Sequence, residues 1–155
     1  MAQEPLTVRI QAEPFDVAAE LAQIAAGRTD VGAVVSFTGL CRAEGGVLAA
    51  LELEHYPGMA EDEMRRVAAE AAERWPLQGL VAIHRHGKIA PGEPIVLVVT
   101  ASAHRAAAFE AAEFLMDYLK TRAPFWKKEH RVDGSFGDWV EAKDVDDKAA
   151  ERWAR

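Results

Sequence analysis

The chain has 155 residues, half of them apolar and 28% charged, and its formal net charge is −7. This composition is typical of a globular protein with a buried core, and we expect a single domain over residues 1–155. The acidic balance argues against general nucleic-acid binding, no apolar run approaches the ~20 residues of a membrane span, and the start shows no signal-peptide pattern. The one cysteine, Cys41, excludes an internal disulfide and a cysteine-rich zinc site. We therefore expect a cytoplasmic protein with no nucleic-acid or membrane partner.

The hydrophobic pattern predicts strands and helices that follow one another without a linker, a repeat or a low-complexity stretch. Strands are expected, in chain order, over Leu6–Gln11, Val31–Thr38, Ala50–Tyr56, Gly79–His86, Pro94–Thr100 and, as a hairpin, over Phe125–Val132 and Phe136–Glu141. Helices are expected after a cap at Asp16, over Ala60–Trp75, from a cap at Ser102 through Thr121, and over Asp144–Trp153. Strands that come in pairs between helices predict an α+β fold, a mostly antiparallel sheet with packed helices in an α/β-hammerhead-like arrangement.

Positive charge is concentrated in DYLKTRAPFWKKE (117–129), where Pro124 must end the long helix. Within twelve residues, and with only Glu129 opposing them, lie Lys120, Arg122, Lys127, Lys128 and Arg131. Cations at a helix C-terminus complement its dipole, which explains the first two but not the other three. Clustered cations attract anions and lower one another's pKa, which activates an amine. The segment is either a solvated turn or a site for an anionic reactant, and we favour the site.

The other end of the same helix begins with His104 and Arg105. Unpaired backbone N–H groups at a helix N-terminus favour anions, so these side chains either complete a phosphate site or merely cap the helix and face solvent. Lys120 lies fifteen residues beyond Arg105, which separates their Cα atoms by ~22 Å in a straight helix. The chain therefore has two sites, or one pocket built across a dimer from opposite helix ends, and we favour the dimer.

Phe37–Arg42 (FTGLCR) is a strand that runs into a loop, a common place for ligand-binding groups. Arg42 suits a carboxylate or phosphate. Cys41 is either a thiol activated by Arg42 or, as we expect, a small buried hydrophobe. His84 and His86 face one way on a strand, but no acidic or cysteine partner has metal-site spacing, so we expect neither a metal nor a cofactor.

Several segments together resemble the large, catalytic subunit of molybdopterin synthase. They are, in chain order, GAVVSFTG (32–39) followed by Arg42, LELEHYPGM (51–59), IHRHGKIAPGE (83–93), SAHRAAAFEA (102–111), MDYLKTRAPFWKKE (116–129) and WVEA (139–142). The resemblance implies transfer of two sulfurs to cyclic pyranopterin monophosphate, which forms the dithiolene of molybdopterin in molybdenum cofactor biosynthesis. It implies that a small ubiquitin-like subunit carries the sulfur as a thiocarboxylate on its C-terminal Gly-Gly tail. The implied assembly is a heterotetramer, a central homodimer of large subunits with a small subunit at each end.

Residue by residue, the resemblance implies that Lys120 and Lys127 are the catalytic pair. It assigns substrate binding or pocket shape to Arg42, His104 and Arg105, and it places Lys128 and Glu129 beside the site as part of its substrate-binding strip. Leu40 and Cys41 are loop residues expected to line it, although the family often has Lys-Val-Arg where this chain has Leu-Cys-Arg, and the loop over 43–47 is short.

Two other interpretations stay open at this stage. One is a binding module without catalysis, which holds a pterin or nucleotide phosphate or docks a ubiquitin-like protein. The other, which the acidic remainder of the chain disfavours, is single-stranded RNA binding through Phe125, Trp126 and the lysines.

Overall fold

The computed structural model describes residues 6–122, 125–140, 148 and 150–154. Its elements run in the order β1 (Leu6–Gln11), α1 (Val17–Ile24), β2 (Ala33–Leu40), β3 (Leu48–His55), α2 (Met59–Arg74), β4 (Leu77–Arg85), β5 (Gly87–Ile89), β6 (Pro94–Ser102), α3 (Arg105–Arg122) and β7 (Phe125–Arg131). This is the mixed α+β class that the sequence predicts.

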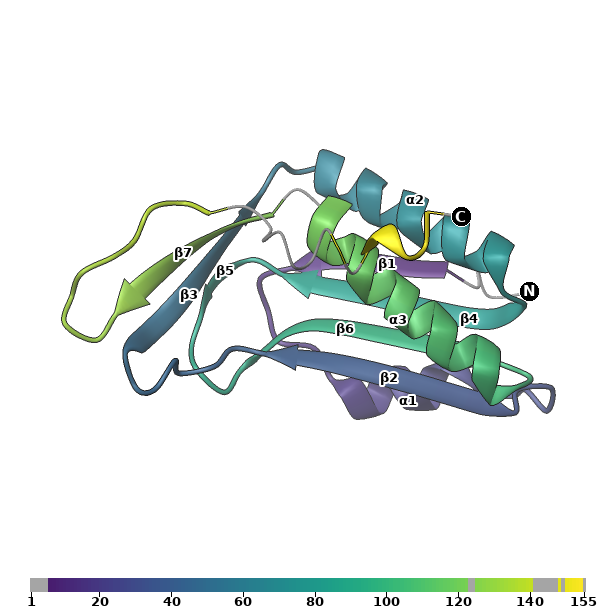
Figure 1. Ribbon diagram of the computed structural model, residues 1–155. Coiled ribbons are helices and arrows are strands. Elements are labelled where there is room, and N and C mark those ends of the chain that lie inside the picture. The colour runs from purple at the N-terminus through teal and green to yellow at the C-terminus, as the bar shows by residue number, and fades with distance from the viewer. Residues whose placement is uncertain (1–5, 123–124, 141–147, 149, 155) are drawn as a thin grey trace.

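The strands form two sheets rather than one (Figure 1). The larger sheet has the order β1-β4-β6-β2, in which β1 and β4 are parallel and the other pairs antiparallel. The smaller sheet has the order β5-β3-β7 and is antiparallel throughout. The smaller sheet extends beyond the ends of β4 and β6, so the two sheets meet beside the C-terminal end of α3.

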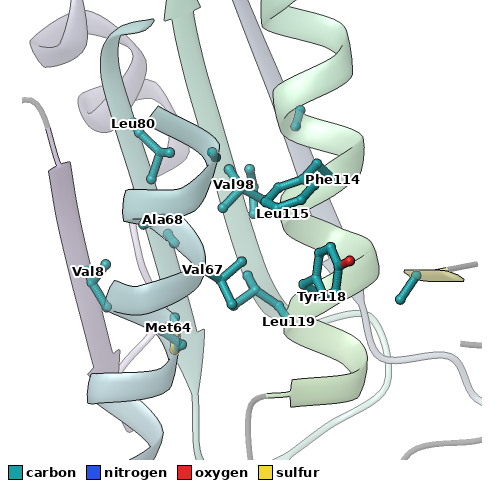
Figure 2. Close-up of a cluster of buried hydrophobic side chains, with 14 residues drawn as sticks. Val8, Met64, Val67, Ala68, Leu80, Val98, Phe114, Leu115, Tyr118 and Leu119 are labelled. Carbon is teal, nitrogen blue, oxygen red and sulfur yellow. The ribbon is translucent and has the colours of Figure 1, made fainter. Parts of the chain in front are cut away.

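The core lies mainly between the larger sheet and the helices α2 and α3, which cover one of its faces (Figure 2). The period of two in β4 decides which side chains face these helices: Leu80 and Ala82 do, whereas Val81 and Ile83 pack against α1 on the opposite face. His84 continues the helix-facing row of β4. The alternation therefore places His84 on the helix-facing side of the sheet, next to the C-terminal end of β4.

The N-terminal cap of α1 is as predicted, since the Asp16 carboxylate accepts from the N–H of Ala19 at 3.1 Å. The predicted cap of α3 is wrong. Ser102 is the last residue of β6, and its hydroxyl donates to the Pro76 carbonyl at 2.9 Å. The first turn of α3 is instead closed by the Ala108 N–H, which donates to the carbonyl of His104 at 3.5 Å.

Two connections also differ from expectation. The segment predicted as a loop between β4 and β6 contains β5, whose Lys88 pairs with Glu52 of β3. The second hairpin strand, as far as it is described, is reduced to isolated bridges that join Lys127 with Val140 and His130 with Phe136.

The expected last helix lies mostly outside the described residues, of which 148, 150 and 151 are helical. Among the described helices, none has the length and apolar character needed to cross a membrane.

Candidate active site

A pocket of about 120 Å³ lies where the last turns of α3 meet the two sheets. Three helical residues, Met116, Leu119 and Lys120, form one wall. The strands supply the rest: Phe37, Gly39 and Leu40 of β2, Leu51 and Leu53 of β3, His84 of β4, Ile95 and Val96 of β6, and Phe125 and Lys127 of β7. The pocket is therefore mostly apolar, with two lysines and one histidine as its ionisable groups.

The floor of the pocket is one row of residues across the larger sheet. Val96 of β6 pairs with Gly39 of β2 on one side and with His84 of β4 on the other. A Cβ atom on Gly39 would lie 2.8 Å from a methyl group of Val96, so this position has room only for glycine unless Val96 moves. Glycine at this position leaves space beside Val96 in the lining of the pocket.

Lys120 and Lys127 reach the same pocket from different elements. Lys120 is exposed in the last turn of α3, one turn after Met116, and Lys127 is partly buried on β7 opposite Leu53 of β3. Directly opposed residues of an antiparallel pair lie on the same face, and Leu53 lines the pocket, so Lys127 faces it too. The fold thus brings together the two residues predicted to be the catalytic pair.

Lys128 and Glu129 stand differently toward the pocket. Lys128 pairs with Glu52 and lies on the opposite face of β7, where its ammonium is 4.4 Å from the ring centre of Phe136 and 5.5 Å from that of Trp139. Glu129 is exposed and pairs with Leu51, on the pocket's side of the strand. Within one chain, only Glu129 of these two faces the site.

Two further cations of the basic segment are engaged in local structure. The Arg122 guanidinium lies 4.1 Å from the ring centre of Tyr118 and 4.0 Å from a Glu70 carboxylate oxygen. Arg131 donates to the Ser135 hydroxyl at 3.3 Å. The segment therefore serves two purposes, and only Lys120 and Lys127 of its five cations line the pocket.

His84 was not predicted as a site residue, yet it lines the same pocket as the two lysines. Its ring stacks on Phe125 with centres 3.8 Å apart and planes 16° apart. Burial, followed by the charges of Lys120 and Lys127, lowers the pKa of His84 to about 4, and the hydrogen bond to the Arg85 carbonyl opposes this shift. The alternation of His84 and His86 on a strand was visible in the sequence, but nothing there indicated which sheet face would meet the lysines.

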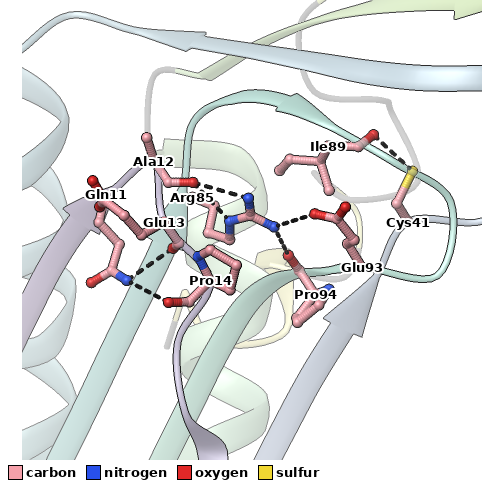
Figure 3. Close-up of polar contacts among 9 residues, drawn as sticks. All are labelled: Gln11, Ala12, Glu13, Pro14, Cys41, Arg85, Ile89, Glu93 and Pro94. Atoms are coloured by element: carbon pink, nitrogen blue, oxygen red, sulfur yellow. Dashed lines mark hydrogen bonds and ion pairs between the residues drawn. The ribbon is translucent and has the colours of Figure 1, made fainter.

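The last residue of β2 and the first two residues of the following loop, Leu40, Cys41 and Arg42, lie in three different environments. Leu40 lines the pocket, whereas Cys41 is buried, with its thiol pointing toward the Ile89 carbonyl at 3.7 Å (Figure 3). Burial raises the pKa of the Cys41 thiol, which agrees with a small buried hydrophobe and not with an activated nucleophile. Arg42 is exposed and pairs with Glu44 at 3.2 Å, so within this chain it does not reach the pocket.

The loop is held by a buried arginine below it. Arg85 donates to the carbonyls of Ala12 and Pro94 and forms a 3.0 Å ion pair with Glu93 (Figure 3). The Glu93 carbonyl in turn accepts from the N–H of Cys41 at 2.9 Å. This chain of contacts fixes the end of β2, and with it Leu40 at the wall of the pocket.

His104 and Arg105 lie at the other end of α3, in a shallow, open hollow with Gly32, Ala103 and Ala106. Both side chains are exposed. A Cβ atom on Gly32 would lie 2.1 Å from the carbonyl oxygen of Ala103, so glycine is required where the segment before β2 crosses the start of α3. The hollow and the lysine pocket share no residue, and an 18-residue helix separates them.

Comparison with known proteins matches this fold and pocket to one family. A sequence model of the family described as MoaE protein matches residues 10–122. A molybdopterin synthase catalytic subunit from Mesorhizobium japonicum is 76% identical over 147 residues, which cover 95% of this chain and 92% of the relative. The solved structure of a molybdopterin biosynthesis MoaE protein from Burkholderia ambifaria has a TM-score of 0.83 and 46% identity, covering 97% of this chain and 99% of that one.

A more distant likeness shows a shared fold alone. A chain from the complex of subunits 1 and 2 of molybdopterin-converting factor from Helicobacter pylori has a TM-score of 0.66 at 21% identity, covering 91% of this chain and 92% of that one.

The chain belongs to the MoaE protein family. The expected relationship to molybdopterin synthase catalytic subunits is confirmed, and with it the class of enzyme, a sulfurtransferase of molybdenum cofactor biosynthesis. Within the described part of the chain, no three His, Cys, Asp or Glu side chains are grouped as they would be to hold a metal ion.

Proposed function

We propose that this chain transfers sulfur from the thiocarboxylate of a small ubiquitin-like subunit to cyclic pyranopterin monophosphate, with Lys120 and Lys127 as the catalytic pair. The observation that carries the proposal is the meeting of these two lysines, from α3 and β7, in one largely apolar pocket. Two lysine side chains that line one largely apolar pocket attract anions, and both reactants are anionic.

Each lysine has a role that its position supports. Lys120 is exposed at the rim, where an incoming thiocarboxylate arrives, and it meets both this group and the electrophilic carbon of the pterin. Lys127 is partly buried, where a cation stabilises negative charge that develops in the transition state or donates a proton. The apolar walls exclude water and so strengthen both interactions.

The pocket also fits the carrier tail. A Gly-Gly terminus has no side chains, which suits a small pocket lined by Gly39, Leu51 and Leu53. The small subunit is thus the partner that this proposal requires. The Helicobacter pylori chain of the same fold comes from a complex of two subunits.

Phosphate binding is assigned to His104, Arg105 and Arg42 in a homodimer. In one chain, the hollow that holds His104 and Arg105 is a helix length away from the lysines, ~22 Å for the fifteen residues from Arg105 to Lys120. A small metabolite cannot touch both. A second chain that brings its own helix start to the pocket supplies the missing cations, so the proposed site is shared between two large subunits.

The reaction is proposed to take place in the cytoplasm. The single cysteine is buried and unpaired, which is compatible with a reducing compartment.

A reconstituted assay tests the proposal. The chain is mixed with cyclic pyranopterin monophosphate and a thiocarboxylated small subunit, and dithiolene formation is followed for wild type, Lys120→Ala, Lys127→Ala and Lys88→Ala. We expect both pocket variants to lose ~100-fold or more in turnover. The Lys88→Ala control, at an exposed residue of β5 outside the pocket, should stay within twofold of wild type. Wild type without product, although it binds a verified partner, would leave a binding module without catalysis as the function.

A further inference from the structure

We propose, on the basis of the sulfur-transfer function above, that His84 is a positioning residue for the reaction. Its neutral imidazole presents Nε2 as a hydrogen-bond acceptor to the Lys120 ammonium, and its ring packs on Phe125 of the strand that carries Lys127. No sequence motif assigned this role to His84. It rests on the tautomer, the surroundings and the stacking of the ring.

The tautomer follows from one contact. Nδ1 of His84 lies 2.8 Å from the carbonyl oxygen of Arg85. A carbonyl oxygen only accepts, so Nδ1 carries the proton and donates it. In a neutral imidazole the other nitrogen is then an unprotonated acceptor, and Nε2 sits at the far end of the side chain, in a pocket that also contains Lys120.

The surroundings keep the ring neutral. The ionisable groups that act on His84 are Lys120 on α3, Lys127 on β7 and His55 on β3, and all three disfavour a positive imidazole. The pKa of about 4 means that almost no imidazolium is present near pH 7. A neutral acceptor lowers the cost of holding two ammonium groups close together, whereas a third cation would raise it.

The stacking links the two sheets at the site. Phe125 on β7 lies between His84 of β4, at 3.8 Å, and His55 of β3, at 5.8 Å, and His55 meets His86 at 4.7 Å. Phe125 precedes Lys127 by two residues and lies on the same face of β7. The His84 ring therefore packs directly against the strand that carries Lys127.

A packing role alone makes a different prediction. If the ring only fills space against Phe125, a phenylalanine at position 84 would serve equally well. If Nε2 matters, a glutamine, whose amide oxygen reaches about the same place, preserves function better than phenylalanine. His84→Phe keeps the stack and removes the acceptor, and His84→Gln keeps an acceptor and removes the stack.

The kinetic test compares these two variants with wild type in the reconstituted assay. We expect His84→Phe to lose tenfold or more in kcat with an unchanged half-saturating concentration of the small subunit, and His84→Gln to stay within about threefold of wild type. Thermal unfolding at pH 7.5 checks that both variants are folded. Full activity of folded His84→Phe, or equal losses in the two folded variants, would overturn the proposal.

A second measurement does not depend on activity. In protein labelled with 15N-histidine, two-bond 1H–15N correlations report which ring nitrogen of His84 carries the proton. We expect the Nδ1–H form at pH 7, and an Nε2 signal that moves in Lys120→Met but stays in place in Lys88→Met. A proton on Nε2, or a signal that ignores Lys120→Met, would contradict the inference even if the enzyme is active. Conversely, the expected signals in an inactive protein would leave the hydrogen bond established and refute the sulfur-transfer function alone.

Discussion

The two ends of α3 differ in how much of a site one chain provides. At the C-terminal end, α3 and strands of both sheets enclose a pocket. Two lysines line this pocket, and most of its other lining residues are apolar. At the N-terminal end, His104 and Arg105 stand exposed in an open hollow made of the helix start and Gly32. The difference teaches that one chain encloses the lysines of the proposed site, whereas its His104 and Arg105 stay open to a second chain.

The largest expected effect comes from joining the two ends across a dimer. Lys120→Ala alone and the double variant His104→Ala/Arg105→Ala alone should each lose ~100-fold or more in turnover. If each site combines one chain's lysines with the other chain's helix start, random mixed dimers restore about a quarter of the wild-type sites. The measurement is turnover after the two variants are co-refolded in equal amounts.

The control is the same mixture made from two different Lys120 variants, which should stay inactive. Failure of the mixture to recover any activity, with mixed dimers verified by mass, would mean that each chain carries its own complete site. The two ends of α3 would then serve independent functions.

The next effect concerns the pH dependence of stability, to which His84 contributes at the C-terminal end of α3. The pKa of His84 falls from 6.5 in the unfolded chain to about 4 in the folded one, so the unfolded chain binds more protons between these values. The contribution of His84 to the free energy of unfolding is therefore fully present above about pH 6.5. It is lost as the pH falls toward 4, by up to ~3 kcal/mol. Denaturant unfolding of wild type and His84→Phe at several pH values measures the difference.

The variant should lack this part of the acid loss, because phenylalanine has nothing to protonate. The groups that face His84, namely Lys120, Lys127 and His55, remain in both proteins, so their contributions cancel in the comparison. If the free energies of unfolding of the two proteins changed in parallel with pH, the pKa of His84 would be the same in the folded and unfolded chains, and the ring would not be buried in the folded one.

How far the sequence predicts the site depends on the residue. The period of two in a strand predicts that Lys127 and Lys128 point to opposite faces, but only the pairing of β7 with β3 reveals that Lys127 is the one in the pocket. His84 and Gly39 are far apart in the chain, and Val96 joins them through pairings that no local pattern specifies. Local signals placed most strands and helices, whereas the site required the order of strands in two sheets.

The Ser102 cap failed for a related reason. A serine before a helix is a sound local signal, yet Ser102 is the last of nine residues of β6 and its hydroxyl is used by Pro76 across the sheet. Tertiary contact overrode a propensity that is worth only ~1 kcal/mol.

Smaller effects on stability are expected from alanine substitutions at two glycines, Gly32 near the start of α3 and Gly39 in the pocket near its C-terminal end. Gly32→Ala places a Cβ 2.1 Å from a backbone oxygen of Ala103, which cannot yield without moving the start of α3, so we expect a loss of ~2–3 kcal/mol. Gly39→Ala meets a methyl group of Val96 at 2.8 Å, and a side-chain methyl shifts at lower cost than a backbone oxygen, so the loss should be about 1 kcal/mol. Denaturant midpoints measure both losses. A larger loss for Gly39→Ala than for Gly32→Ala would contradict the view that the backbone neighbour of Gly32 yields less than the side-chain neighbour of Gly39.

The smallest effect is expected from the residue that looks most reactive in the sequence. Cys41 lies behind the pocket wall at 3% exposure, and its thiol points at the Ile89 carbonyl, away from solvent. Cys41→Ala removes one buried sulfur atom and should cost about 1 kcal/mol of stability, while turnover stays within twofold of wild type. A Leu40→Ala variant is the useful contrast, because Leu40 is the neighbour that lines the pocket and its truncation should slow turnover more than it lowers stability. Loss of turnover in Cys41→Ala with an unchanged melting temperature would mean that sulfur passes through the thiol, and the lysine pair would no longer account for the reaction.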